Sequence, residues 1–138
     1  MSTPVVHLSR RYSFSASHRL YTDHLSFEEN EAIFGKCANP NGHGHNYGLT
    51  VTVAGPVDAP TGAVMPLDDL DAIVRRNVLD AYDHRYLNLD VEDYVDLVPT
   101  GENIARRVWE RLEGDLDGLL RRVVVDETRN NRFEYPAI

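Results

Sequence analysis

The chain has 138 residues, of which 42% are hydrophobic and 26% charged, as is usual for a globular domain, and its formal net charge is −8. We expect one domain over residues 1–138, and the acidic balance argues against a nucleic-acid-binding or polybasic membrane protein. No apolar run approaches the roughly 18 residues of a membrane span. The N-terminal residues lack a signal-peptide pattern, and the single cysteine suits a reducing compartment, so the expected location is cytoplasmic.

The first half of the chain predicts two long strands joined by an irregular loop. Val5 to His18 is predicted to be a strand, because from Tyr12 to Ser17 serines alternate with aromatic and alanine residues with a period of two. Leu25 to Glu31 predicts a short helix, with Ser26 and the glutamate three residues later as a capping box. Glycines and prolines over 35–44 predict a loop, and alternation resumes from His45 to Val53. The two strands can pair as a long antiparallel hairpin.

The second half predicts two amphipathic helices and then two short strands. Apolar residues from Leu67 to Tyr82 follow a three-or-four spacing, which is typical of a helix with one buried face. An acidic loop over 87–98 separates it from a second helix, whose apolar stripe runs from Ile104 to Leu116. The last two strands are expected over Arg122–Thr128 and Arg132–Tyr135.

The predicted order of strands and main helices is ββααββ. Because strands and helices do not alternate as βαβ units, this order favours an α+β fold, a four-stranded antiparallel sheet with two helices on one face. Such a sheet has two open edges, which tend to be covered or paired with another chain.

Three histidines form a candidate metal site. His18 ends the first strand, while His43 and His45 stand two residues apart at the start of the second and face the same side of an extended backbone. A hairpin can bring all three together, and three neutral imidazoles suit zinc with one position left open. If Cys37 were a fourth ligand, the site would be closed and structural. The remaining histidines outside the motifs, His7 and His24, are expected to be surface residues.

Cys37 and Asp83–His84 are candidates for proton transfer. An inert buried thiol is the common role of a cysteine, but Lys36 and a nearby metal ion would lower the pKa of Cys37 and favour its thiolate. Asp83 and His84 follow the end of a predicted helix. The histidine could interact with the helix dipole, or the aspartate could orient the imidazole as an acid–base pair. Sequence reasoning leaves both alternatives open.

In order along nearly the whole chain, several segments resemble the 6-pyruvoyl-tetrahydropterin synthase family of tunnelling-fold (T-fold) proteins. The cysteine–histidine loop is the most specific of them. The matching segments are residues 13–20, 34–47, 79–89, 100–103 and 127–131. The resemblance implies a T-fold whose trimers close a barrel of strands, two trimers forming a homo-hexamer with active sites between subunits.

The resemblance also implies a lyase of tetrahydrobiopterin biosynthesis that converts 7,8-dihydroneopterin triphosphate to 6-pyruvoyl-tetrahydropterin and triphosphate. It implies a zinc cofactor, with magnesium often present in assays. The roles that the resemblance implies are zinc ligation by His18, His43 and His45, catalysis by Cys37, Asp83 and His84, and substrate binding by Glu127, Thr100, Gly101, Arg19 and Lys36, with Glu127, Thr100 and Gly101 at the pterin ring.

Two alternatives to this activity remain. The sibling enzyme 6-carboxy-tetrahydropterin synthase, of queuosine biosynthesis, usually has three residues between the cysteine and the first histidine. The five residues between Cys37 and His43 match the pyruvoyl type, whereas Pro99 to Asn103 looks more like the sibling. The other alternative is a non-catalytic pterin-binding protein with a structural zinc.

Overall fold

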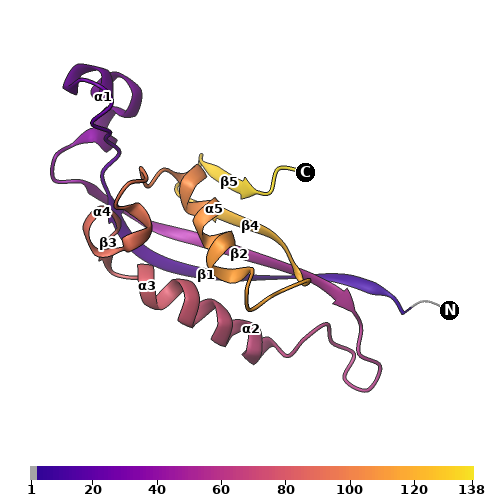
Figure 1. The fold of residues 1–138 in the computed structure, drawn as a ribbon. Helices are drawn as coiled ribbons and strands as arrows, with labels where there is room; N and C mark the ends of the chain where they lie inside the picture. Colours follow the sequence, from indigo (N-terminus) through magenta and orange to yellow (C-terminus); the bar gives the residue numbers. More distant parts are fainter. Residues whose placement is uncertain (1–2) are drawn as a thin grey trace.

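The computed structural model describes residues 3–138, which form one sheet covered by helices (Figure 1). The five strands are β1 (Val5–His18), β2 (His43–Pro56), β3 (Arg85–Tyr86), β4 (Leu120–Asp126) and β5 (Arg132–Tyr135). The α-helices are α1 (Phe27–Phe34), α2 (Leu67–Val74), α3 (Asp80–Tyr82), α4 (Leu87–Asp90) and α5 (Gly101–Leu112). Short 3₁₀ segments are η1 (Gly35–Ala38) and η3 (Glu92–Tyr94), and η2 (Arg75–Leu79) is π-helical.

A long antiparallel hairpin of β1 and β2 forms the centre of the sheet (Figure 1). Its register runs from the Val5–Pro56 pair at one end to the His18–His43 pair at the other. The hairpin confirms the sequence prediction, except that β2 begins at His43 and not at His45. Because side chains alternate between the faces of a strand, this register places the histidines of both strands on one face at one end of the sheet.

The prediction of a four-stranded, purely antiparallel sheet is wrong in the number of strands and in the direction of one of them. A fifth strand, β3, lies at the edge of the sheet, which has the order β3-β1-β2-β4-β5. It pairs parallel to β1, with Arg85 opposite Ala16 and Tyr86 opposite Ser17. A strand of two residues is too short to show an alternating pattern. The α+β class is confirmed, since the remaining neighbours pair antiparallel.

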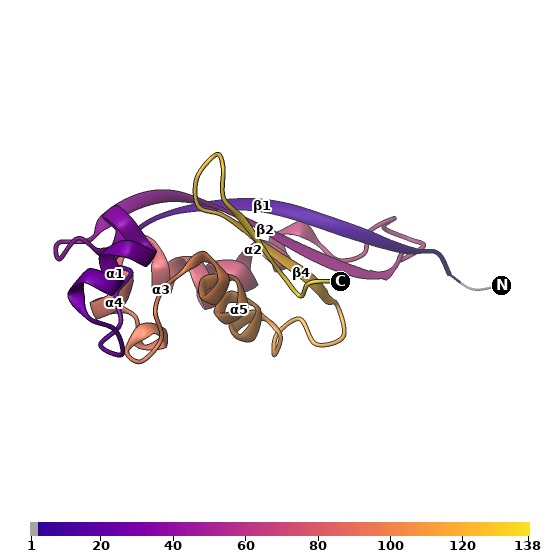
Figure 2. The same ribbon diagram turned by 90° about the horizontal axis from the view of Figure 1, so that it is seen from above.

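The helices lie along one face of the sheet, where they bury the core (Figure 2). The side chains that meet there come from β2, β4, α2 and α5 and are fully buried, among them Leu49, Val51, Leu70, Ile104, Val108, Val123 and Val125. Burial of such a side chain contributes roughly 1.5–3 kcal/mol relative to exposure, so this layer holds the sheet and the helices together. Within residues 3–138, no helix is long and apolar enough to span a membrane.

The predicted capping box of the first helix is confirmed, but the helix begins and ends later in the chain than predicted. The Ser26 hydroxyl accepts a hydrogen bond from the Glu29 amide, and the Glu29 carboxylate accepts one from the Ser26 amide. This capping box fixes the start of α1, which continues to Phe34 rather than ending at Glu31. The helix and the following η1 project from the histidine end of the hairpin (Figure 1).

The other predicted elements have corrected boundaries. The helix expected over Leu67–Tyr82 is helical throughout but contains the π-helical η2, and the expected acidic loop over 87–98 contains α4 and η3. The second main helix ends at Leu112, although Leu116 beyond it is still buried. These boundaries depend on hydrogen bonding, which the apolar spacing does not reveal.

Candidate active site

The three predicted metal ligands lie together at one end of the β1–β2 hairpin. His18 is opposite His43 in the register, and the ring centroids of His43 and His45 are 4.6 Å apart. One ring nitrogen from each of the three lies within 4.8 Å of the others. Among the described residues, this group does not include Cys37. The expected histidine cluster is therefore present, with the thiol beside it.

The hydrogen bonds of His18 leave a nitrogen available for a metal. Its Nδ1 lies 2.9 Å from the carbonyl oxygen of Pro99, which can only accept, so Nδ1 carries the hydrogen. The lone pair is then on Nε2, which is buried without a hydrogen-bond partner. A backbone carbonyl that orients an imidazole in this way is typical of metal-binding histidines. The Nδ1 atom of His43 is likewise buried without a partner.

Burial keeps His18 and His45 in the form that binds metals. It lowers the pKa of His18 to about 4 and also lowers the pKa of His45. Near neutral pH both imidazoles are uncharged, and only the neutral ring has a lone pair for a metal. Three neutral imidazoles fit a zinc ion that retains one open position.

Cys37 lies beside the cluster in η1. Its sulfur is 3.5 Å from Nε2 of His43, and its carbonyl accepts a hydrogen bond of 2.7 Å from the Leu20 amide. Burial, and after it the Glu127 carboxylate, raises the pKa of Cys37. The expected lowering by Lys36 is therefore wrong in this structure, because Lys36 extends from an exposed position while the thiol is half-buried.

Glu127 follows β4 directly, in the turn to β5. Strand β4 spans Leu120–Asp126 rather than the predicted Arg122–Thr128, and the Glu127 amide donates to the Asn131 carbonyl at 3.1 Å. The carboxylate is close enough to raise the pKa of both Cys37 and Tyr47. It also lines a pocket of about 530 Å³ together with Arg11, Asn46, Gly48 and Arg129. The structure thus brings Glu127 to the region of the thiol and the histidines.

Thr100 and Gly101 form the start of α5. The Thr100 hydroxyl caps the helix by accepting from the Asn103 amide at 3.2 Å. A Cβ atom on Gly101 would lie 2.0 Å from the ring of Phe133, so only glycine fits beneath that ring. The backbone amides of this first turn are the groups that the resemblance assigns to the pterin.

Asp83 and His84 lie at the β3 edge of the sheet. Asp83 Oδ1 accepts from the Ser15 amide at 2.9 Å, and this bond is the main reason that its pKa is lowered. His84 Nδ1 is 3.1 Å from the same oxygen, and its side chain is 82% exposed. Among the hydrogen bonds and ion pairs of residues 3–138, none joins this pair to Cys37. Asp83 and His84 therefore form the predicted pair, but within a single chain this pair does not contact the thiol of Cys37.

Arg19 and Lys36, the two basic residues predicted to bind the substrate, differ in their surroundings. Arg19 Nε donates to the Ala38 carbonyl at 3.1 Å, and its guanidinium lies 4.0 Å from the centre of the Tyr21 ring. Arg19 therefore helps to hold η1 in place, whereas Lys36 is exposed on that segment. Both remain predictions for substrate binding. His7 and His24 are exposed, as expected.

Two further residues of the site were missed by sequence reasoning. Pro99 supplies the carbonyl that orients His18, and no sequence pattern indicates such a backbone contact. Tyr47 is fully buried, with its hydroxyl 3.2 Å from Nδ1 of His18. Its position two residues after His45 on the same strand places it on the histidine face, and this spacing was a usable signal.

An α+β fold with a histidine triad at the end of a strand hairpin, flanked by a thiol and a carboxylate, defines a candidate metalloenzyme. Residues 7–137 match the family model described as 6-pyruvoyl tetrahydropterin synthase. The chain therefore belongs to the 6-pyruvoyl tetrahydropterin synthase family.

Individual relatives agree with this assignment. The chain is 50% identical to human 6-pyruvoyl tetrahydrobiopterin synthase, over 93% of this chain and 89% of the relative. The solved 6-pyruvoyl tetrahydropterin synthase of Caenorhabditis elegans superposes with a TM-score of 0.93 at 41% identity, covering 100% of this chain and 99% of that one. The 6-carboxy-5,6,7,8-tetrahydropterin synthase of Bacillus subtilis is 30% identical over 78% of this chain and 71% of its own.

Proposed function

We propose that the protein is a zinc-dependent 6-pyruvoyl-tetrahydropterin synthase. It is a carbon–oxygen lyase that converts 7,8-dihydroneopterin triphosphate to 6-pyruvoyl-tetrahydropterin and eliminates triphosphate. The observation that carries this proposal is the triad of His18, His43 and His45, whose converging nitrogens leave a metal position open, with the Cys37 sulfur alongside but outside the group. The 50% identity to the human synthase supports it independently.

The three histidines hold the zinc ion. When bound, zinc acts as a Lewis acid that polarises substrate hydroxyl oxygens and acidifies the neighbouring C–H bonds. A magnesium ion would be held by the triphosphate oxygens rather than by the histidines, because it prefers oxygen ligands. Cys37 then takes up and returns protons at the substrate side chain.

The remaining residues bind and orient the substrate. The Glu127 carboxylate accepts two parallel N–H bonds from the guanidine-like edge of the pterin, a pairing that fixes the ring in its plane. The backbone at Thr100 and Gly101 supports the ring, and Arg19 and Lys36 interact with the triphosphate. Asp83 and His84 form the acid–base pair that works with Cys37.

The proposed assembly is a homo-hexamer of two trimers, in which a neighbouring copy supplies Asp83 and His84. Two features support it. The pair lies at the β3 edge, apart from Cys37 of the same chain, and its imidazole is largely exposed. In addition, β3 pairs only with Ala16 and Ser17, so most of the outer edge of β1 is open to another strand. An interface at this edge would complete the site.

The decisive experiment identifies the product. Purified, zinc-loaded protein is incubated with 7,8-dihydroneopterin triphosphate, and products are analysed by mass spectrometry together with triphosphate release. We expect 6-pyruvoyl-tetrahydropterin. The second candidate, 6-carboxy-tetrahydropterin synthase, is favoured by the Pro99–Asn103 segment and predicts 6-carboxy-tetrahydropterin with acetaldehyde. An absence of turnover by the zinc-loaded protein would contradict both enzymes.

Cys37→Ala separates the lyase from a non-catalytic pterin-binding protein. If Cys37 moves protons, the variant keeps its zinc and its fold but loses activity by roughly 10²–10⁴-fold, the usual contribution of a general acid or base. If Cys37 is instead a ligand of a structural zinc, the same variant loses metal and stability. His24→Ala is a suitable control, because His24 is exposed.

A further inference from the structure

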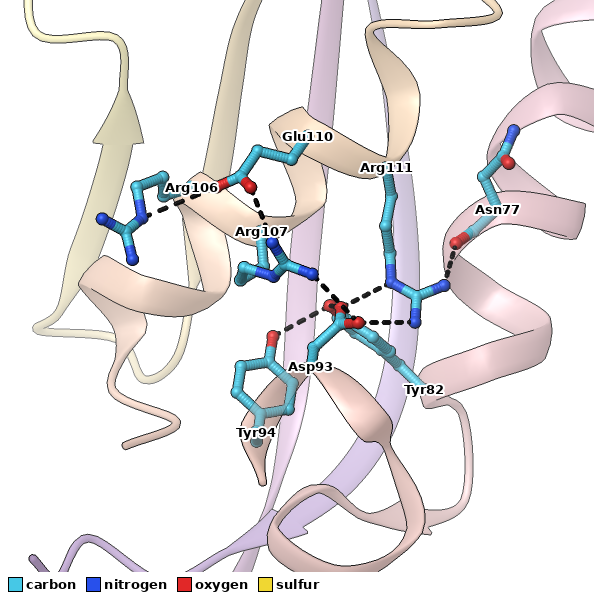
Figure 3. A network of polar contacts seen from close by, with 8 residues as sticks. All are labelled: Asn77, Tyr82, Asp93, Tyr94, Arg106, Arg107, Glu110 and Arg111. Atoms are coloured by element: carbon cyan, nitrogen blue, oxygen red, sulfur yellow. Dashed lines mark hydrogen bonds and ion pairs between the residues drawn. The ribbon is translucent and has the colours of Figure 1, made fainter. Parts of the chain in front are cut away.

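A partly buried ion pair between Arg111 and Asp93 connects α5 to the η3 segment (Figure 3). The Asp93 side chain is 7% exposed, and Arg111 donates to both of its carboxylate oxygens, from Nε at 2.6 Å and from Nη2 at 2.9 Å. Arg107 adds a second guanidinium at 3.3 Å. Removing two charges from water costs free energy, and their mutual attraction often does no more than offset this cost. The burial of such a pair is therefore weak evidence for a role in stability. The other contacts of Asp93 and Arg111 show which segment the ion pair fixes.

Two of those contacts reach the helical segment that ends at Asp83. The Tyr82 hydroxyl donates to Asp93 at 2.7 Å, and Arg111 Nη1 donates to the Asn77 carbonyl at 2.9 Å (Figure 3). Asn77 lies in the π-helical η2, a type of helical irregularity that is frequent at functional sites. The ion pair therefore fixes this segment at two points, one of them immediately before Asp83.

The end of this segment determines the placement of Asp83 and His84. Tyr82 is fully buried, with its ring edge-on to Phe14 at a centroid distance of 5.8 Å. Two residues after Tyr82, His84 has a φ of 62°, a left-handed conformation that side chains other than glycine rarely adopt. A conformation of this kind persists only where the surroundings enforce it. We therefore expect a change at Tyr82 to alter the conformation of His84, two residues later.

The histidine cluster is held by a different contact. The Pro99 carbonyl that orients His18 follows Val98, whose own carbonyl accepts from Asn103 Nδ2 at 2.8 Å. This contact comes from the first turn of α5, whereas Arg111 is in its last turn. Loss of the ion pair should therefore alter the Asp83–His84 pair and leave metal binding in place.

We propose that Asp93 and Arg111 are positioning residues for the synthase reaction. They hold Tyr82 and η2 so that the carboxylate of Asp83 and the imidazole of His84 keep the orientation needed for proton transfer. The proposal rests on the proposed function, which assigns proton transfer to this pair. Misplacement of a catalytic group by about 1 Å can cost about 10²-fold in rate, so the expected effect is on kcat.

The test uses two variants and a matched control. Arg111→Lys keeps the charge but lacks the planar fork, while the double variant D93N/R111M removes both charges and leaves an oxygen to accept from Tyr82. The control is Asp71→Asn, since Asp71 also accepts two bonds from an arginine, Arg10, and one from a tyrosine, Tyr12, but joins α2 to β1. Both test variants should lower kcat by roughly tenfold or more, with KM and zinc content within twofold of wild type.

Hydrogen exchange gives a readout that does not require turnover. In Arg111→Lys we expect faster exchange of the His84 amide, which donates to the Ser15 carbonyl at 2.6 Å, and no change in Asp71→Asn. Unchanged exchange at His84, wild-type kcat in both test variants, or an equal loss of kcat in Asp71→Asn would each overturn the positioning role. A wild-type protein that turns over no substrate, together with faster His84 exchange in Arg111→Lys, contradicts the proposed function and leaves the positioning intact.

Discussion

The imidazole of His18 is oriented by the carbonyl oxygen of Pro99, 81 residues further along the chain and 2.9 Å away. His18 ends β1, and Pro99 stands just before α5, so this contact joins the sheet to the helical layer. It sets the tautomer of a proposed metal ligand and directs Nε2 toward the other two histidines. The geometry of the metal site thus depends on where α5 begins.

Asn103→Ala should weaken zinc binding without removing a ligand. The amide of Asn103 donates to the Val98 carbonyl at 2.8 Å and so fixes the backbone next to Pro99. Changes to groups that orient metal ligands typically reduce metal affinity by about 10–100-fold, and we expect a loss in this range. Competition with a zinc chelator measures it, with Glu102→Ala as an exposed control in the same helix. An affinity equal to that of wild type would contradict the role of Pro99.

Mixing two inactive variants tests whether the active site lies between subunits. Cys37→Ala and His84→Ala should each be inactive alone. When the two are co-expressed or refolded together, mixed assemblies contain some sites with an intact Cys37 from one copy and an intact His84 from the other, and activity should return in part. If both groups acted within one chain, every copy would carry one defect and the mixture would stay inactive. Light scattering on the same samples gives the oligomeric state.

Gly101→Ala should destabilise the fold at the start of α5. The added Cβ would lie 2.0 Å from the Phe133 ring, which is close enough to force a displacement of β5 or of the helix. Overpacking of this kind typically costs about 1–3 kcal/mol, measured as the change in free energy of unfolding in urea. Gly114→Ala is the control, because nothing lies within 4 Å of the Cβ position there. Equal stability of the two variants would contradict the tight contact with Phe133.

Stability should fall at acid pH in part because of Asp93. Burial by itself would raise the pKa of Asp93, but hydrogen bonds from Arg111 and Tyr82 outweigh it, and they hold the pKa below its ordinary value. A carboxyl group with a lowered pKa in the folded state contributes stability above its unfolded pKa and loses it as the pH falls through the folded value. The urea-unfolding free energy should therefore decrease below about pH 4.

The double variant D93N/R111M isolates the contribution of Asp93 to the pH dependence of stability. Its free energy of unfolding should depend less steeply on pH below about pH 4 than that of the wild-type protein, because the titrating carboxyl group is absent. In Asp71→Asn, which removes a carboxyl group from the Arg10 pair, the change in slope should be smaller, since that pair is more exposed than the Asp93 pair and solvent screens it more. Identical slopes in the wild-type protein and the D93N/R111M variant would contradict the expected role of Asp93.

The sequence predicted the features of this fold that repeat along the chain. The alternation that ends at His18 and resumes at His45 predicted the hairpin, and the hairpin register placed the three histidines together. Contacts between segments far apart in the chain have no such signal. The two-residue strand β3, the Pro99 carbonyl and the pairing of Asp93 with Arg111 each depend on how separate elements pack. The position of Cys37 was predicted, whereas its pKa shift depends on burial, which spacing does not reveal.

The short edge strand has a consequence for handling the protein. Because β3 pairs with β1 only at Ala16 and Ser17, a separated subunit presents a long row of unpaired amide and carbonyl groups, next to the exposed side chains of Val5 and Val6. Edges of this type recruit other strands indiscriminately. Dilution or mild denaturant that separates the copies of the proposed hexamer should therefore yield strand-paired precipitate in place of a long-lived monomer. In the proposed hexamer, subunit association would therefore protect solubility as well as complete the site.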